Sequence, residues 1–421
     1  MAGGPDAARA RLVDELREGG RLTSPAVEAA FRSVPRHLFL PELSASDAYQ
    51  DEAFVIKTDA DGLPLSSSSQ PAIMAIMLEQ LGLVPGHRVL EIGTGTGYNA
   101  ALMACLVGER GSVVTVDIDT DLVARAKENL AAAGYPDVTV LAGDGGFGAP
   151  GYAPYDRVIV TAGAWDLAPD WLAQLGPGGR LVLPLSLRGI QLCLALEHGD
   201  GPWRSRSACR CGFIRMAGCF ASPEPFVPFG PQPGLHVQAD DGRAPDAAAL
   251  YDALAGPVAD LPTGVLVAGL AALSDADLWI TVTGPELVRL TITGGGPLRG
   301  GALPLLPFGA LAGSDGVREP DWAGDFGVAA LIPARPPPPA AARGPAEFEV
   351  AVRGFGPWGG ELARRLAGRV GAWDERGRPR ASDISVTAYP AGLPVPSGPG
   401  QLLLDRRHTR LALSWPGPVA P

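Results

Sequence analysis

The sequence predicts an α/β protein: a Rossmann-like, doubly wound sheet with N-terminal helices and an additional C-terminal α+β domain. Two observations favour this fold. Residues 88–97 read RVLEIGTGTG, an apolar run followed by alternate glycines, and residues 98–107 have the composition of an apolar helix. Residues 113–117, about 20 positions after the glycines, form a second apolar run that ends in an acid. A strand, a glycine-rich turn, a helix and an acid after the next strand are typical of nucleotide-binding sheets.

The following segments narrow the class of cofactor. A dinucleotide fold favours a glycine three positions after Gly95, where this chain has Tyr98. Further segments follow in order: a helix, a strand, Gly-Asp-Gly, a strand, and a turn with a strand, at residues 119–134, 138–141, 143–145, 155–161 and 177–184. This order resembles that of S-adenosylmethionine (SAM)-dependent methyltransferases, which implies SAM as cofactor and S-adenosylhomocysteine as product.

The cofactor residues follow from these motifs. Asp117 is expected to bind the ribose hydroxyls and Asp144 the adenine amino group. A helix cap is the alternative for Asp117, although Asp119 can serve that helix, and an Asx turn is the alternative for Asp144. The full predicted set is Glu91, which orients the loop, with Gly93, Thr94, Gly95, Gly97, Asp117, Ile118, Gly143, Asp144 and Gly145.

Length and composition constrain the organisation. A chain of 421 residues with 46% hydrophobic residues favours two domains. We divide it into an N-terminal helical segment with a substrate loop (1–68), a SAM-binding core (69–220) and an α+β extension expected to recognise a peptide (225–421). The net charge of −11 argues against a nucleic-acid partner. The absence of a leader and of a long apolar run predicts a cytoplasmic protein without a membrane partner.

The cysteines and the flanking elements complete the pattern. An odd count of five cysteines suits a reducing compartment, and Cys209-x-Cys211 indicates one face of a strand rather than a metal site, so no metal is expected. Helices are predicted at 7–18, after a Ser24 cap, at 246–255 and at 359–370. Strands are predicted at 191–197, 207–216, 278–282, 287–292 and 347–352, and the prolines of 335–342 predict a surface loop.

Three segments outside the cofactor motifs indicate a family. They are VPRHLFLPE at 34–42, AYQDE at 48–52 and SQP at 69–71, together with GDG at 143–145 and TAGA at 161–164. Over about residues 10–218 the chain resembles the protein-L-isoaspartate O-methyltransferase family. The resemblance implies methylation of an isoaspartyl α-carboxylate, whose ester then closes to a succinimide.

The departures from that family bear on the substrate. Residues 61–69, DGLPLSSSS, replace the family's Gly-His-Gly-Gln-Thr-Ile-Ser, and about 200 residues follow the core. These features and residues 165–171 are similar to long members that act with lanthipeptide and graspetide precursors and methylate an aspartate to give an aspartimide. We therefore favour a modified precursor peptide as partner. General repair of isoaspartyl proteins and a catalytically silent binding module are the alternatives, and the oligomeric state stays open.

The resemblance also assigns the acceptor side. Ser69 matches the family's active-site serine, which implies that it holds the acceptor carboxylate; the alternative is a helix N-cap, since Pro71 follows. Ser67 matches the family's threonine and is the second catalytic candidate. Ser66, Ser68 and His37 are candidate substrate contacts, although Arg36 and His37 suit a surface turn equally well.

Overall fold

The computed structural model describes residues 4–60, 62–199, 201–223, 226–228, 230, 235–238, 246–256, 258–268, 270–284, 288–292, 310–313, 327–333, 347–396, 398 and 400–416. The chain divides into two compact units. Unit 1 comprises Met1–Ser186, Gln191–Ser222 and Ser385–Leu413; unit 2 comprises Leu187–Ile190, Pro223–Ile384 and Ser414–Pro421. The predicted start of the extension, residue 225, lies close to a unit boundary. Residues 385–413 of that extension instead belong to unit 1, because their strands join its sheet.

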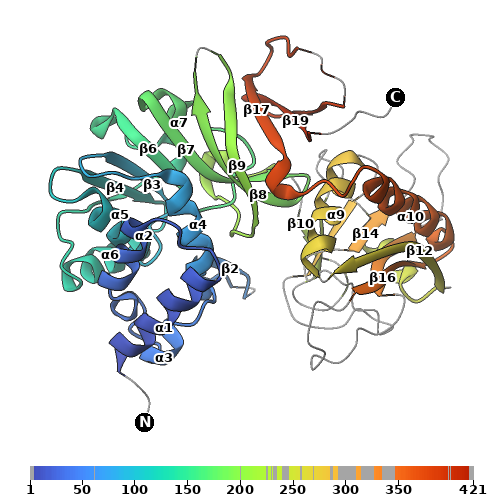
Figure 1. Cartoon of the computed structure of the whole chain (residues 1–421), viewed down its shortest axis with the longest axis horizontal. Helices are drawn as coiled ribbons and strands as arrows, with labels where there is room; N and C mark the ends of the chain where they lie inside the picture. Colours follow the sequence, from blue (N-terminus) through green and yellow to red (C-terminus); the bar gives the residue numbers. More distant parts are fainter. Residues whose placement is uncertain are drawn as a thin grey trace. The chain divides into compact units, whose positions relative to one another are not determined.

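Unit 1 is built on a ten-stranded sheet with the order β18-β19-β17-β9-β8-β7-β6-β3-β4-β5 (Figure 1). Strands β3 to β7 are parallel, β9 is antiparallel to β8, and β17 is antiparallel to β9. The predicted α/β methyltransferase fold is confirmed. Because β3 lies between β4 and β6, the loops that leave these strands meet at one edge, where such sheets bind ligands. The strands are β3 (Arg88–Ile92), β4 (Ser112–Asp117), β5 (Thr139–Ala142), β6 (Tyr155–Val160), β7 (Leu175–Leu187), β8 (Ile190–His198), β9 (Trp203–Cys211), β17 (Ser385–Pro390), β18 (Leu402–Asp405) and β19 (Thr409–Ser414).

The helices of unit 1 bury apolar faces against this sheet and against each other. Helix α5 packs on β3 and β4, and α6 packs on β4 and β5. The predicted cap of α2 is confirmed, because the Ser24 hydroxyl accepts a hydrogen bond from the Val27 N–H. The helices are α1 (Pro5–Glu18), α2 (Pro25–Ser33), α3 (Ala45–Ala48), α4 (Pro71–Leu81), α5 (Tyr98–Val107), α6 (Thr120–Ala132) and α7 (Pro169–Ala173), with a 3-10 turn at Arg36–Phe39.

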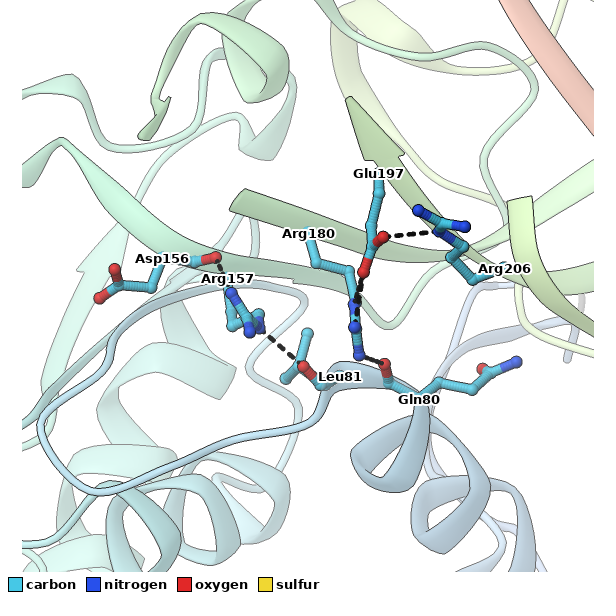
Figure 2. Close-up of polar contacts among 7 residues, drawn as sticks. All are labelled: Gln80, Leu81, Asp156, Arg157, Arg180, Glu197 and Arg206. Atoms are coloured by element: carbon cyan, nitrogen blue, oxygen red, sulfur yellow. Dashed lines mark hydrogen bonds and ion pairs between the residues drawn. The ribbon is translucent and has the colours of Figure 1, made fainter. Parts of the chain in front are cut away.

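The hairpin of β1 (Phe54–Thr58) and β2 (Pro64–Ser68) leads directly into α4. Arginines from β6 and β7 hold the C-terminal end of this helix (Figure 2). Arg157 Nε donates to the Leu81 carbonyl at 2.8 Å, and Arg180 donates to the Gln80 carbonyl. Arg180 is also paired with Glu197 at 2.6 Å. Helix α4 is therefore fixed to the sheet at the end remote from the serines.

The strands β18 and β19 form a hairpin that is fastened to the loop after β6. Asp166 is buried and accepts hydrogen bonds from the His408 N–H and the Thr409 hydroxyl, both at 2.6 Å. The Arg406 guanidinium lies 4.6 Å from the Trp165 ring centroid. Residues 165 and 166 thus anchor a hairpin from the end of the chain to unit 1.

Unit 2 contains a seven-stranded antiparallel sheet with the order β10-β11-β13-β14-β15-β16-β12. Its helices are α8 (Ala247–Ala253), α9 (Leu270–Thr283) and α10 (Gly359–Glu375). Its strands are β10 (Phe226–Pro228), β11 (Leu235–Gln238), β12 (Val258–Ala268), β13 (Val288–Ile292), β14 (Ala310–Gly313), β15 (Gly327–Pro333) and β16 (Glu347–Phe355).

Two sequence predictions need correction and one cannot be compared. The strand predicted at 278–282 is wrong, because these residues form the end of α9. Leu278, Trp279, Ile280 and Val282 are all buried, and a helix buried on several faces has the same apolar run as a buried strand. The strand predicted at 207–216 ends at Cys211. The proline run at 335–342 lies outside the described residues.

Candidate active site

The glycine-rich loop after β3 has the backbone that its sequence predicts. Gly93, Gly95 and Gly97 have φ values of +100°, +53° and +89°. A Cβ atom at Gly93 would lie 2.5 Å from the Thr161 hydroxyl oxygen, and one at Gly97 would lie 3.1 Å from Leu130. Side chains are thus excluded by conformation and by space, and the bare backbone of the loop is left for a ligand.

A cavity of about 340 Å³ opens between this loop and the β1–β2 hairpin. Among the predicted residues, Gly97, Gly143, Asp144 and His37 do not line it. The predicted residues that do are Ser66, Ser67, Ser68, Ser69, Glu91, Gly93, Thr94, Gly95, Asp117, Ile118 and Gly145. Residues predicted to bind the cofactor and residues predicted to bind the acceptor, which are separate in sequence, therefore line one cavity.

Glu91, on strand β3, is hydrogen-bonded to residues that flank the glycine-rich loop. Its carboxylate is fully buried and accepts hydrogen bonds from Asn99 Nδ2 and Thr115 Oγ1, each at 2.7 Å. Thr115 Oγ1 lies 2.8 Å from Thr94 Oγ1, so the network reaches the loop itself. Burial raises the pKa of Glu91 to about 7, and the hydrogen bonds from Asn99 and Thr115 oppose this rise.

Asp117 ends β4 beside the same loop. Its carboxylate accepts hydrogen bonds from the Gly95 N–H and the Asp119 N–H, each at 3.0 Å. The N-cap of α6 is Asp119, whose side chain accepts from the N–H groups of Asp121 and Leu122. The helix-cap alternative for Asp117 is therefore wrong, and Asp117 remains at the cavity wall, where a carboxylate can accept hydrogen bonds from a ribose diol.

Asp144 lies outside the cavity and is held by backbone donors. Its oxygens accept hydrogen bonds from the Gly146 N–H at 2.9 Å and the Cys219 N–H at 2.7 Å. Burial raises the pKa of Asp144, but these donors outweigh it and the net pKa is lowered. The hydrogen bond from the Gly146 N–H forms an Asx turn, which was the alternative to adenine binding for Asp144. Contact of Asp144 with adenine remains a prediction.

Ser66, Ser67, Ser68 and Ser69 form another wall of the cavity. Ser66 and Ser67 are half-buried on β2, Ser68 is buried, and Ser69 is half-buried between β2 and α4. The helix-cap alternative for Ser69 is wrong, because Gln70 is the N-cap residue. In the part of the chain that the structure describes, the Ser69 hydroxyl has no hydrogen-bond partner, which leaves it free to bind a ligand.

A carboxylate from a distant turn supports the start of α4. Asp51 Oδ1 accepts a hydrogen bond from the Ala72 N–H at 2.8 Å, and its Oδ2 lies 3.2 Å from Gln70 Nε2. The usual role of an N-cap side chain is thus performed by a residue far away in sequence.

The surface-turn interpretation of residues 36 and 37 is wrong for Arg36, which is 0% exposed. The His37 ring lies away from the cavity, with Nδ1 3.0 Å from the Tyr49 hydroxyl. Burial is the main reason that the pKa of His37 is lowered. A contact between His37 and the substrate remains a prediction without support from this geometry.

A third wall of the cavity was not predicted from the sequence. Residues 213–217, after β9, line the cavity, and the Gly163 N–H and carbonyl fix them through hydrogen bonds with Ile214 and Met216. Arg215 contributes a positive charge to the residues that line the cavity. No motif indicates this wall, because it forms only when the loops after β6 and β9 meet.

Within the described residues, neither a cluster of metal-binding side chains nor a membrane-spanning helix is found. The described side chains include no group of three or more His, Cys, Asp or Glu residues that could bind a metal ion. Cys193 and Cys209 are opposite one another on β8 and β9. Among the helices that can be described, none has the length and apolar character needed to cross a bilayer.

The cavity fits a nucleoside cofactor. Its volume is within the range of small-molecule sites, about 300–1,000 Å³. The glycines give an open backbone cradle, and Asp117 supplies a hydrogen-bond acceptor at the end of the neighbouring strand. Together with the strand order, this geometry defines a SAM-dependent methyltransferase.

Comparison with known proteins specifies the family. Residues 7–219 match the family described as Protein-L-isoaspartate(D-aspartate) O-methyltransferase (PCMT). The protein-L-isoaspartate O-methyltransferase of Methanopyrus kandleri is 42% identical over 220 residues, 52% of this chain and 95% of the relative. That of Methanosarcina mazei is 45% identical over 208 residues, 49% of this chain and 83% of the relative. A solved structure named protein-L-isoaspartate O-methyltransferase is 24% identical with a TM-score of 0.49, covering 90% of this chain and 96% of its own.

The chain belongs to the protein-L-isoaspartate(D-aspartate) O-methyltransferase family. It is therefore a SAM-dependent protein carboxyl O-methyltransferase rather than a silent binding module. The match ends at residue 219, so it includes only Leu187–Ile190 of unit 2 and none of the strands β17 to β19.

Proposed function

We propose that this enzyme methylates the α-carboxylate of isoaspartyl residues in proteins or peptides, with Ser69 holding the acceptor. The observation that supports this most strongly is the shared cavity, which is lined both by Ser69 and by the Gly93–Gly95 loop. The relatives named above carry the same activity in their names, which favours the repair reaction over a specialised one.

The chemistry requires position more than acid–base catalysis. SAM supplies an activated methyl group when bound. An acceptor carboxylate is already ionised at neutral pH and needs no base. Glu91 is unsuited to be one, because both its oxygens accept hydrogen bonds from Asn99 and Thr115. The task left to the chain is to orient the acceptor, and alignment of this kind contributes on the order of 7–11 kcal/mol in favourable cases.

Exchange of Ser69 for Ala tests the assignment. We expect kcat/KM for an isoaspartyl peptide to fall by about one to two orders of magnitude, while SAM affinity stays within about threefold. Ser67→Ala, on the preceding strand β2, is the comparison variant, and a smaller fall in kcat/KM is expected there. Loss of SAM binding in Ser69→Ala, or unchanged turnover, would remove Ser69 from the acceptor site.

A specific observation also supports a second candidate, methylation of an aspartate in a cross-linked precursor peptide to give an aspartimide. Residues 61–69, which include the predicted acceptor serines, depart from the family pattern, and residues 223–384 of unit 2 lie beyond the family match. In this candidate unit 2 recognises the modified peptide.

Substrate competition on the full-length enzyme separates the two candidates. Repair predicts that linear isoaspartyl peptides are methylated with the higher kcat/KM; tailoring predicts preference for a cross-linked peptide, followed by a net loss of one water in mass spectrometry. A chain cut after residue 225 does not serve this purpose, because the cut also removes strands β17 to β19 of unit 1.

A further inference from the structure

Three residues that line the cavity share one buried neighbour, Arg36. Its Nη1 and Nη2 both donate to the Ser69 carbonyl, each at 3.1 Å. Nη1 lies 3.7 Å from Met74 Sδ, and the guanidinium carbon lies 5.2 Å from the Tyr98 ring centroid. Arg36 itself does not line the cavity. It therefore contacts the acceptor wall, which we define as residues 66–69, on the side away from the cavity.

The remaining contacts of Arg36 bring in the preceding segment. Nε donates to the Ala48 carbonyl at 2.8 Å, at the end of α3. Among the described residues, its hydrogen-bond acceptors are carbonyl oxygens and a sulfur, and no carboxylate forms a salt bridge with it. Burial lowers the pKa of Arg36, although an arginine remains charged at neutral pH.

Burial of a charge without an ion pair is costly, and the hydrogen bonds from Arg36 to backbone carbonyls offset part of that cost. Only a guanidinium has the planar fork that reaches these carbonyls together. We propose that Arg36 is a positioning residue for the methyl acceptor: it fixes the backbone of Ser69 so that the hydroxyl faces the cavity. Its positive charge also favours a carboxylate on the other side of that wall. This inference rests on the proposed role of Ser69.

The other end of α4 provides a matched control. Arg157 Nε donates to the Leu81 carbonyl (Figure 2). Arg36 Nε donates in the same way to the Ala48 carbonyl. Neither Arg157 nor Leu81 lines the cavity. Replacement of Arg157 by Lys therefore reports the general cost of losing a guanidinium–carbonyl contact to α4.

The experiment compares Arg36→Lys with Arg157→Lys in the full-length enzyme. SAM affinity is measured by calorimetry, and kcat and KM are measured with a linear isoaspartyl peptide, with rates expressed per SAM-binding site. We expect Arg36→Lys to lower kcat/KM by about 10- to 100-fold with SAM affinity within about threefold of wild type. For Arg157→Lys, both kcat/KM and SAM affinity are expected to stay within about twofold of the wild-type values. Equal kinetics in the two variants overturn the inference, and so does an Arg36→Lys protein that has lost SAM binding.

Ser69→Ala, measured alongside, separates this inference from the proposed function. If Ser69→Ala has normal kcat/KM, the role of Ser69 fails, and the inference about Arg36 fails with it. If Ser69→Ala is impaired and Arg36→Lys is not, only the inference about Arg36 fails.

Discussion

Two of the three walls of the cavity are held by different means. The predicted cofactor wall, formed by the Gly93–Gly95 loop, is supported from within the β3–α5–β4 unit: Asp117 accepts from the Gly95 N–H, and Glu91 reaches Thr94 through Thr115. The predicted acceptor wall, formed by residues 66–69, is supported from segments that precede it and belong to no such unit, since Arg36 binds the Ser69 carbonyl and Asp51 accepts a hydrogen bond from the first turn of α4. Motifs describe the first wall well because its contacts join neighbouring strands of one motif. The second depends on contacts that no local pattern contains.

The largest expected effect concerns Glu91 on the cofactor wall. Its pKa of about 7 in the folded protein is above the ordinary value of 4.5. Between these values the unfolded chain releases the proton and the folded chain keeps it, so stability falls as pH rises. Relative to Glu91→Gln, the wild type should lose on the order of 3 kcal/mol of unfolding free energy between pH 4.5 and pH 7. Urea unfolding at several pH values measures this, and parallel curves would contradict it.

Asp117→Ala tests whether the cofactor wall acts independently of the acceptor wall. We expect SAM binding to weaken by about 1–3 kcal/mol, because the Gly95 N–H loses its acceptor and the ribose hydroxyls would lose the acceptor proposed for them. The KM of the isoaspartyl peptide at saturating SAM should change little. Calorimetry and steady-state kinetics give the two values, and an effect confined to the peptide KM would reverse the assignment.

Asp51→Ala is the counterpart on the acceptor wall. Removal of the cap from the Ala72 N–H should cost about 1 kcal/mol of stability and raise the peptide KM. SAM affinity should remain unchanged. Asp51→Asn, which retains an acceptor oxygen, is the control and should lie between the variant and the wild type.

Lys57 connects the β1 strand to the start of α6 and should have the smallest effect. Its Nζ is 2.5 Å from Asp119 and 3.0 Å from Asp121, but all three side chains are partly exposed. Lys57→Ala should lower the melting temperature only slightly, and the loss should shrink at high salt, because exposed ion pairs are weak and screened. Thermal melting in low and high salt checks this; a larger, salt-independent loss would mean that the two walls are coupled through this pair.

The two walls also differ in how well they could be predicted from the sequence. The strand order, the glycine loop and the Asp119 cap could be predicted, because each depends on residues close in sequence or on one repeated strand–helix pattern. Arg36 belongs to the VPRHLFLPE motif at residues 34–42. Its burial could not be predicted, because it depends on the Ala48 and Ser69 carbonyls, which only the fold brings together. The return of residues 385–413 to unit 1 was missed for the same reason, since strand pairing with β9 leaves no local signal.

A double-mutant cycle tests the long-range support of the acceptor wall most directly. It compares kcat/KM for one isoaspartyl peptide in the wild type, Arg36→Lys, Ser69→Ala and the double variant. If Arg36 acts through Ser69, its replacement should cost almost nothing once the Ser69 hydroxyl is absent, so the double variant should equal Ser69→Ala. Additive losses in the double variant would contradict this and show that Arg36 and Ser69 act separately.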